Sequence, residues 1–128
     1  MRIFVADANR EIRLSVQILV NHQADMNVTG IAVRSDGLVK QIEATKPDLL
    51  LLNWDLPGQS LLDKVVHLRT TMPRLKLVVM SVRPEARSIA LSAGADAFVS
   101  MNVPPDELLN TLRDVGSSST YRMTREVG

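Results

Sequence analysis

The chain is 128 residues long, 45% of them hydrophobic, and its formal net charge is +1. This length allows one domain and excludes two. The basic residues are dispersed and do not form the stripe that nucleic-acid-binding domains normally show, so we expect no direct binding to nucleic acid. Cysteine is absent, which excludes disulfide bonds and thiolate chemistry and agrees with a reducing compartment.

Five short apolar runs predict β-strands. The first, residues 3–6, is too short and too quickly followed by charges to be a signal peptide. No run approaches the roughly 20 apolar residues that a membrane helix needs, so we expect a soluble cytoplasmic protein. The other four runs are residues 28–33, 49–52, 77–80 and 97–99. Because the runs are unbroken, they favour strands that are covered on both faces, as in a parallel sheet.

The leucine run at residues 49–52 has two interpretations when it is taken alone. Four consecutive leucines suit a buried helix as well as a strand. Pro47 before the run and Pro57-Gly58 after it favour a short strand, because these residues interrupt a helix.

Apolar residues at helical spacing lie between these runs, and each set places an apolar stripe on one helix face. The sets are Ile12, Val16 and Leu19; Leu38 and Ile42; Leu61, Val65 and Leu68; and Leu108, Leu112 and Val115. Pro84 followed by Glu85 predicts the first turn of a further helix, and Pro104-Pro105 with two acids opens the last one. Five strand–helix repeats predict an α/β fold with a doubly wound parallel sheet.

The repeats end near residue 116. We therefore predict one domain over residues 1–116 and a polar tail over residues 117–128, which lack periodicity. In a doubly wound sheet, ligands bind beyond the carboxyl ends of the strands. The side chains to consider are those directly after the apolar runs, namely Asp7, Asn53, Ser81 and residues 100–101.

Four segments stand in a specific order between residues 2 and 115: IFVADAN, KPDLLLLNWDLPG, KLVVMS and AGADAFVSMNVPPDELL. Together they resemble the receiver domain of bacterial two-component response regulators. The last segment is especially similar to receivers that precede a helix-turn-helix DNA-binding domain. The resemblance implies a flavodoxin-like fold with five strands in the order 2-1-3-4-5, five helices, a role in signal transduction and no enzymatic activity.

The resemblance also implies a phosphorylation site, of which this sequence keeps only a part. The family uses two acids after the first strand to hold Mg²⁺; here they correspond to Asp7 and Ala8. The phosphoacceptor aspartate at the end of the third strand corresponds to Asn53. The hydroxyl after the fourth strand is present as Ser81, and the lysine after the fifth strand is replaced by Met101.

These replacements predict a degenerate site. A phosphoacceptor attacks phosphorus as an anionic nucleophile, which an amide cannot do. Mg²⁺ prefers anionic oxygen ligands, and loss of the lysine removes the cation that balances the phosphoryl oxygens. We therefore expect no catalytic residue and no cofactor. One alternative stays open, in which Asp7 and Asp55 together make a feeble Mg²⁺ site; otherwise Asp55 is a solvated acid beside a turn.

Each remaining site residue also has a plain structural interpretation. Asp7 accepts backbone N–H groups at a strand–helix junction, and Asn53 either keeps the shape of the site or has drifted. Ser81 caps the start of the following helix, and Met101 packs at the top of the sheet. Trp54 is either an anchor for a partner or a partly exposed side chain without one.

The resemblance favours a pseudo-receiver that signals through protein contacts without phosphorylation. Receivers commonly pair through their fourth helix, fifth strand and fifth helix, and mixed charge there suits a two-fold contact. Expected partners are a sensor kinase, an output domain, another regulator or a second copy in a weak homodimer. Two alternatives stay open: a phosphorylatable receiver with a rearranged acidic site, and the N-terminal part of a helix-turn-helix transcription regulator. The residues expected on the pairing face are Arg83, Arg87, Phe98, Asp106 and Arg113.

Overall fold

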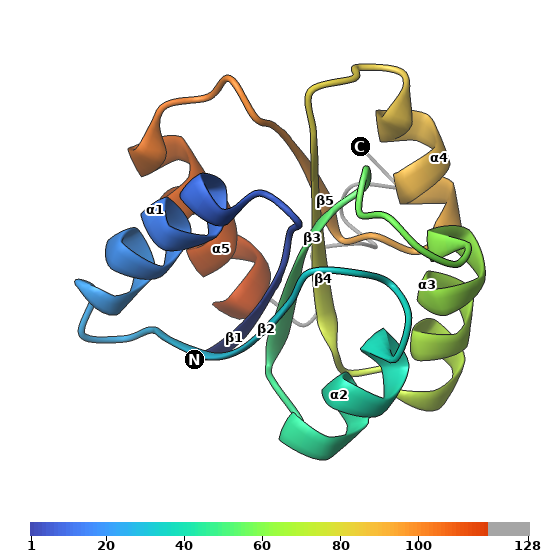
Figure 1. The fold of residues 1–128 in the computed structure, drawn as a ribbon. Helices are drawn as coiled ribbons and strands as arrows, with labels where there is room; N and C mark the ends of the chain where they lie inside the picture. Colours follow the sequence, from blue (N-terminus) through green and yellow to red (C-terminus); the bar gives the residue numbers. More distant parts are fainter. Residues whose placement is uncertain (118–128) are drawn as a thin grey trace.

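The structure is a computed structural model and describes residues 1–117. Strands and helices alternate throughout these residues (Figure 1). The five predicted strands and five predicted helices are confirmed there. The predicted polar tail lies outside the described residues except for Ser117, which ends the last helix. The elements are β1 (Arg2–Ala6), α1 (Arg10–Asn21), β2 (Asn27–Ala32), α2 (Leu38–Thr45), β3 (Leu49–Asn53), α3 (Leu61–Thr71), β4 (Lys76–Ser81), α4 (Ala86–Ala93), β5 (Ala97–Ser100) and α5 (Pro105–Ser117).

The sheet is parallel throughout, with the strand order β2-β1-β3-β4-β5. This confirms the doubly wound fold. The leucine run at residues 49–52 belongs to the central strand β3, which pairs with β1 on one side and β4 on the other. The run is therefore a strand and not a buried helix. Figure 1 shows α1 and α5 covering one face of the sheet, and α2, α3 and α4 covering the other.

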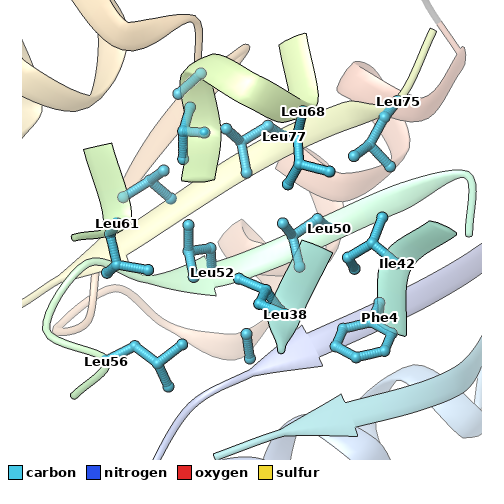
Figure 2. Close-up of a cluster of buried hydrophobic side chains, with 14 of the residues drawn as sticks. Phe4, Leu38, Ile42, Leu50, Leu52, Leu56, Leu61, Leu68, Leu75 and Leu77 are labelled. Atoms are coloured by element: carbon cyan, nitrogen blue, oxygen red, sulfur yellow. The ribbon is translucent and has the colours of Figure 1, made fainter. Parts of the chain in front are cut away.

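Alternate residues of the central strands enter two separate cores. Phe4, Leu50 and Leu52 pack against α2 and α3 in one core (Figure 2). Ile3 and Leu51 pack against α1 and α5 in the other. Both sets are fully buried. A strand with a core on each face needs apolar residues at every position, which explains the unbroken runs in the sequence.

Local signals explain some of the helix ends. The Asn9 side chain caps α1 by accepting the Ile12 N–H at 3.1 Å, and Gly94 ends α4 in the left-handed region at φ 118°, where glycine carries no steric penalty. One helix start differs from the prediction, which placed Pro84 in the first turn of α4. The helix begins at Ala86, because the Ala86 N–H bonds three residues back and forms a turn first.

No helix within residues 1–117 is long and apolar enough to cross a membrane. Inside the fold, the Asp96 side chain is 6% exposed and forms an ion pair with Arg69 of α3 at 3.5 Å. The same carboxylate accepts the Leu77 N–H of β4 at 2.8 Å. Asp96 therefore ties α3 to the start of β4 from the turn that precedes β5.

Candidate functional site

The carboxyl ends of β1, β3 and β5 bring three of the predicted site residues into contact. The Asn53 side-chain Nδ2 donates a hydrogen bond to Asp7 Oδ2 at 3.1 Å. The same nitrogen lies 3.8 Å from the Met101 sulfur. Ser81 ends β4, which pairs with β3, and it joins the group through Asp55. Parallel strands end at one edge of the sheet, so residues far apart in sequence meet there.

Asp7 forms the floor of the site. The residue is 1% exposed, and its second carboxylate oxygen accepts the Asn9 N–H at 2.8 Å. This is the junction role that its position after β1 suggested. Arg13 approaches from α1 but donates to the backbone carbonyls of Asp7 and Ala8, at 2.9 and 3.0 Å. The hydrogen bonds to the Asp7 carboxylate are thus from an amide side chain and a backbone N–H.

Asn53 uses both ends of its amide. Its Nδ2 group faces Asp7 as described, and its Oδ1 atom accepts the Asp55 N–H at 2.8 Å, a local turn that asparagine favours. An aspartate at this position would place a second carboxylate oxygen about 3 Å from Asp7 Oδ2, and the two groups would repel each other in the absence of a cation. The amide is therefore matched to its neighbour, because it offers a donor where the family carries an acceptor of the phosphoryl group.

Asp55, Ser81 and Arg83 form a connected group, here called the Asp55 latch. The Ser81 hydroxyl donates to Asp55 Oδ2 at 3.2 Å, while Arg83 Nε and Nη2 lie 2.8 and 2.5 Å from Asp55 Oδ1. Ser81 Oγ also accepts the Arg83 N–H at 3.0 Å. Ser81 was predicted to cap the next helix. That prediction is wrong, because α4 begins only at Ala86 and the serine binds the loop before it.

Sequence analysis missed the latch. It placed Arg83 on a pairing face and treated Asp55 as either a metal ligand or a solvated acid. The pair is partly exposed, with 50% of the Arg83 side chain and 35% of the Asp55 side chain accessible. One signal could have indicated it: Asp55 follows Asn53 by two residues and Arg83 follows Ser81 by two, at the ends of neighbouring strands.

Mg²⁺ is the metal that a receiver fold implies, and the donor set does not fit it. Asp7 supplies one buried carboxylate, but Oδ2 faces an amide N–H group, and the neighbouring position is Ala8. Both oxygens of Asp55 are engaged by Ser81 and the Arg83 cation. Within residues 1–117, no group of three metal-ligating side chains is assembled. Mg²⁺ requires several hard oxygen ligands in near-octahedral order, which these residues do not offer.

The larger side chains around the site belong to the two cores. Trp54 and Phe98 are partly buried and pack against the α2–α3–α4 core. The Trp54 backbone N–H donates to the Met80 carbonyl at 2.8 Å, and this hydrogen bond fixes the turn after β3. Met101 packs against the α1–α5 core, as its plain structural interpretation predicts.

Three of the five residues predicted on a pairing face make contacts within the chain. Arg83 is bound to Asp55, and Phe98 packs inward. Arg113 lies on the side of α5 that faces the α1–β2 turn, where its Nε is 3.1 Å from Asp25 Oδ2. This hydrogen bond from Arg113 holds the pKa of the Asp25 carboxyl below its usual value. Arg87 and Asp106 are exposed.

Comparison with known proteins agrees with this fold. The family model of the response regulator receiver domain matches residues 3–113. Oxygen regulatory protein NreC of Staphylococcus aureus is 27% identical over 124 residues, which are 94% of this chain and 57% of the relative. The chain thus spans little more than half the length of the curated relatives it matches.

Solved receiver structures share the fold. The signal receiver domain of the putative response regulator NarL from Mycobacterium tuberculosis has a TM-score of 0.83 and 23% identity, covering 91% of this chain and 96% of that one. A LuxR-family DNA-binding response regulator from Staphylococcus aureus has a TM-score of 0.81 and 20% identity, covering 90% and 98%. At these identities the likeness concerns the fold.

Proposed function

Because the chain belongs to the response regulator receiver domain family, we propose that it is a receiver that signals through protein contacts without phosphorylation of an aspartate. The observation that carries this proposal is the hydrogen bond from Asn53 to Asp7 at 3.1 Å. It places a neutral amide at the phosphoacceptor position and directs that amide's donor at the remaining acid. The site then has no carboxylate nucleophile at the acceptor position.

The Asp55 latch supports the same proposal. In the family, the hydroxyl after the fourth strand binds the oxygens of the phosphoryl group. In this chain the Ser81 hydroxyl donates to the Asp55 carboxylate at 3.2 Å, and Arg83 balances that negative charge. The Asp55 carboxylate thus accepts the hydrogen bond of the hydroxyl, and the loop between β4 and α4 is held without a phosphoryl group.

Fluorescence of Trp54 tests the proposal directly, because Trp54 follows the acceptor position. We expect no change when the protein is titrated with Mg²⁺ and then with beryllofluoride or acetyl phosphate, since the site lacks a metal ligand set and an acceptor. Unfolding in urea, which exposes the indole, serves as the control for a responsive signal. A saturable change that needs both Mg²⁺ and the phosphoryl mimic would overturn the proposal. Its loss in Asp55→Ala would identify a rearranged site.

The latch should contribute little to stability and more to local order. We expect Asp55→Ala to lower the free energy of unfolding by at most about 1 kcal/mol, because the ion pair is partly exposed. Hydrogen exchange at the Arg83 amide should become faster, because Ser81 Oγ, which accepts that N–H, loses its own partner. Glu43→Ala on α2 is the matched control and should leave this exchange unchanged. Equal exchange rates at the Arg83 amide in the two variants would show that the latch does not order this loop.

The proposed partners are proteins: a sensor kinase, an output domain, another regulator or a second copy of the chain. We propose no direct binding of nucleic acid by residues 1–117, because the basic residues are dispersed along the sequence and several arginines are paired with acids. Arg34 pairs with Asp36, and Arg113 with Asp25, at 3.7 and 3.1 Å. Paired arginines are less able to replace the counterions of a phosphate backbone. We also propose that the chain is not an enzyme.

A second candidate function follows from the lengths of the relatives. NreC extends well beyond the matched region, and one similar structure is described as a DNA-binding response regulator. As a second candidate, we therefore propose that the chain is the regulatory part of a longer DNA-binding regulator. Immunoblotting of the native cells with an antibody against residues 1–117 tests this. A single band clearly larger than the 128-residue chain favours the longer regulator, whereas a band at the size of the chain favours the stand-alone domain.

A further inference from the structure

A cavity of about 760 Å³ lies beside the degenerate site, on the α1–α5 side of the sheet. Its walls come from α1, the ends of β4 and β5, and the start of α5. Residues from all of these elements line it, including Ile12, Ile18, Val82, Val99, Met101 and Val103. The cavity therefore lies at the carboxyl edge of the sheet, where doubly wound proteins bind their ligands.

The cavity wall carries the most exposed large apolar side chains of the described residues. Ile18 is 60% exposed and Val82 is 59% exposed, the two highest values among the large hydrophobic residues. Both are surface positions, where a polar residue would be compatible with the fold. Contiguous apolar surface of this kind on a concave wall is typical of a binding site.

The charge of the lining limits what can bind. Glu11 is the one charged residue among those that line the cavity, and the polar groups are the side chains of Asn9, Ser15, Ser100 and Asn102. No lysine or arginine contributes. An anion would therefore enter without a counter-charge and beside a carboxylate, which costs desolvation energy. A neutral molecule with one or two hydrogen-bonding groups matches the lining.

The size of the cavity is compatible with a small molecule. Small-molecule sites have volumes of about 300–1,000 Å³, and this cavity lies within that range.

The cavity borders the degenerate site. Met101 lines the cavity, and its sulfur lies 3.8 Å from Asn53 Nδ2. Val82 also lines it and stands between Ser81 and Arg83, two members of the Asp55 latch. An occupant would thus contact one neighbour of Asn53 and the residue between two members of the latch. In the family the Met101 position carries a lysine, and here a flexible apolar side chain faces the cavity.

We propose that this cavity is a binding site for a neutral, mainly apolar small organic molecule. The proposal goes beyond the proposed function and does not depend on it, because probe binding and the response to beryllofluoride are separate measurements.

A matched pair of fluorescent probes tests the proposal. N-phenyl-1-naphthylamine is neutral, and 1-anilinonaphthalene-8-sulfonate has the same ring system with an added sulfonate. We expect saturable binding of the neutral probe with one probe per chain, and about tenfold or more weaker binding of the sulfonate. Equal affinity for the two probes, or no saturation with the neutral one, would contradict a site for neutral molecules.

Substitutions at exposed positions locate the binding. Ile18→Asp and Val82→Asp should each weaken binding of the neutral probe about tenfold or more, because they place a charge on the cavity wall. Ile89→Asp is the control: it is a similarly exposed position, at 50%, in the separate groove between α3 and α4. Circular dichroism confirms that each variant is folded. Equal loss in the control would overturn the proposal, as would binding that falls with rising protein concentration, the mark of a second copy covering the cavity.

Discussion

Replacing Asp96 with alanine is expected to lower the free energy of unfolding by about 3 kcal/mol, the lower end of the cost of removing one partner of a buried ion pair. The Asp96 carboxylate accepts the Leu77 N–H at 2.8 Å and pairs with Arg69 at 3.5 Å, and both charged side chains are largely buried. Alanine at this position leaves the Leu77 N–H and the Arg69 guanidinium without the carboxylate as an acceptor. Arg69 keeps its hydrogen bond to the Leu75 carbonyl, which places the expected cost at the lower end.

Urea denaturation followed by circular dichroism measures this change. Asp96→Asn is the informative companion, because an amide oxygen can still accept the Leu77 N–H while the charge is lost; it should cost less than alanine. Asp114→Ala, at an exposed position on α5, should stay within about 0.5 kcal/mol of the original protein. If Asp96→Ala changed the free energy of unfolding as little as Asp114→Ala, the buried ion pair between Asp96 and Arg69 would not stabilise the fold.

The fold could be predicted from the sequence because its elements have strong local signals. The leucines of β3 are the plainest case: a central strand with a core on each face has no polar position, so its run is unbroken. The start of α4 was misplaced, because Pro84 fits the first turn of a helix and fits an isolated turn equally well. Whether Pro84 lies in the helix or in a turn before it depends on the backbone conformation of the neighbouring residues, which cannot be predicted from residue types alone.

The site was predicted less completely than the fold. Asp7, Asn53 and Met101 could be grouped because the resemblance aligns each with the end of a strand, and the structure brings them into contact. The partners of Ser81 and Arg83 could not be predicted, because side chains at strand ends choose among several acceptors within reach. The ion pair of Asp96 with Arg69 was also missed, since 27 residues separate its members in sequence.

Restoring the family's residues should restore phosphorylation, and this is the largest functional change that we expect. The original protein and Asn53→Asp alone should accept no phosphoryl group from acetyl phosphate with Mg²⁺. In the single variant, Ala8 leaves the metal with one carboxylate fewer than the family supplies, and Met101 leaves the phosphoryl oxygens without the positive charge of the lysine. The triple variant Ala8→Asp, Asn53→Asp, Met101→Lys should be modified on most chains.

Each added change has a physical role in the triple variant. Ala8 is exposed, so an aspartate fits there and adds a second carboxylate for Mg²⁺ beside Asp7. The Met101 sulfur lies 3.8 Å from Asn53 Nδ2, so a lysine of similar length can bring its ammonium to the acceptor. Its methylene stem can keep the packing of the partly buried methionine. The metal and the lysine together supply the positive charge that the phosphoryl oxygens require.

Intact-protein mass spectrometry measures the outcome as the addition of one hydroxylamine-labile phosphoryl group per chain. The double variant Ala8→Asp, Met101→Lys is the matched control, because it has the metal ligands and the lysine but keeps the Asn53 amide. Modification of the double variant would assign the acceptor to another carboxylate than position 53, namely Asp7, Asp55 or the one added by Ala8→Asp, and would support a rearranged acidic site. If the triple variant remained unmodified, the Asp55 carboxylate would be the remaining obstacle, since it already accepts the hydrogen bond of the Ser81 hydroxyl at 3.2 Å. Adding Asp55→Ala to the triple variant would then release that hydroxyl for the phosphoryl oxygens.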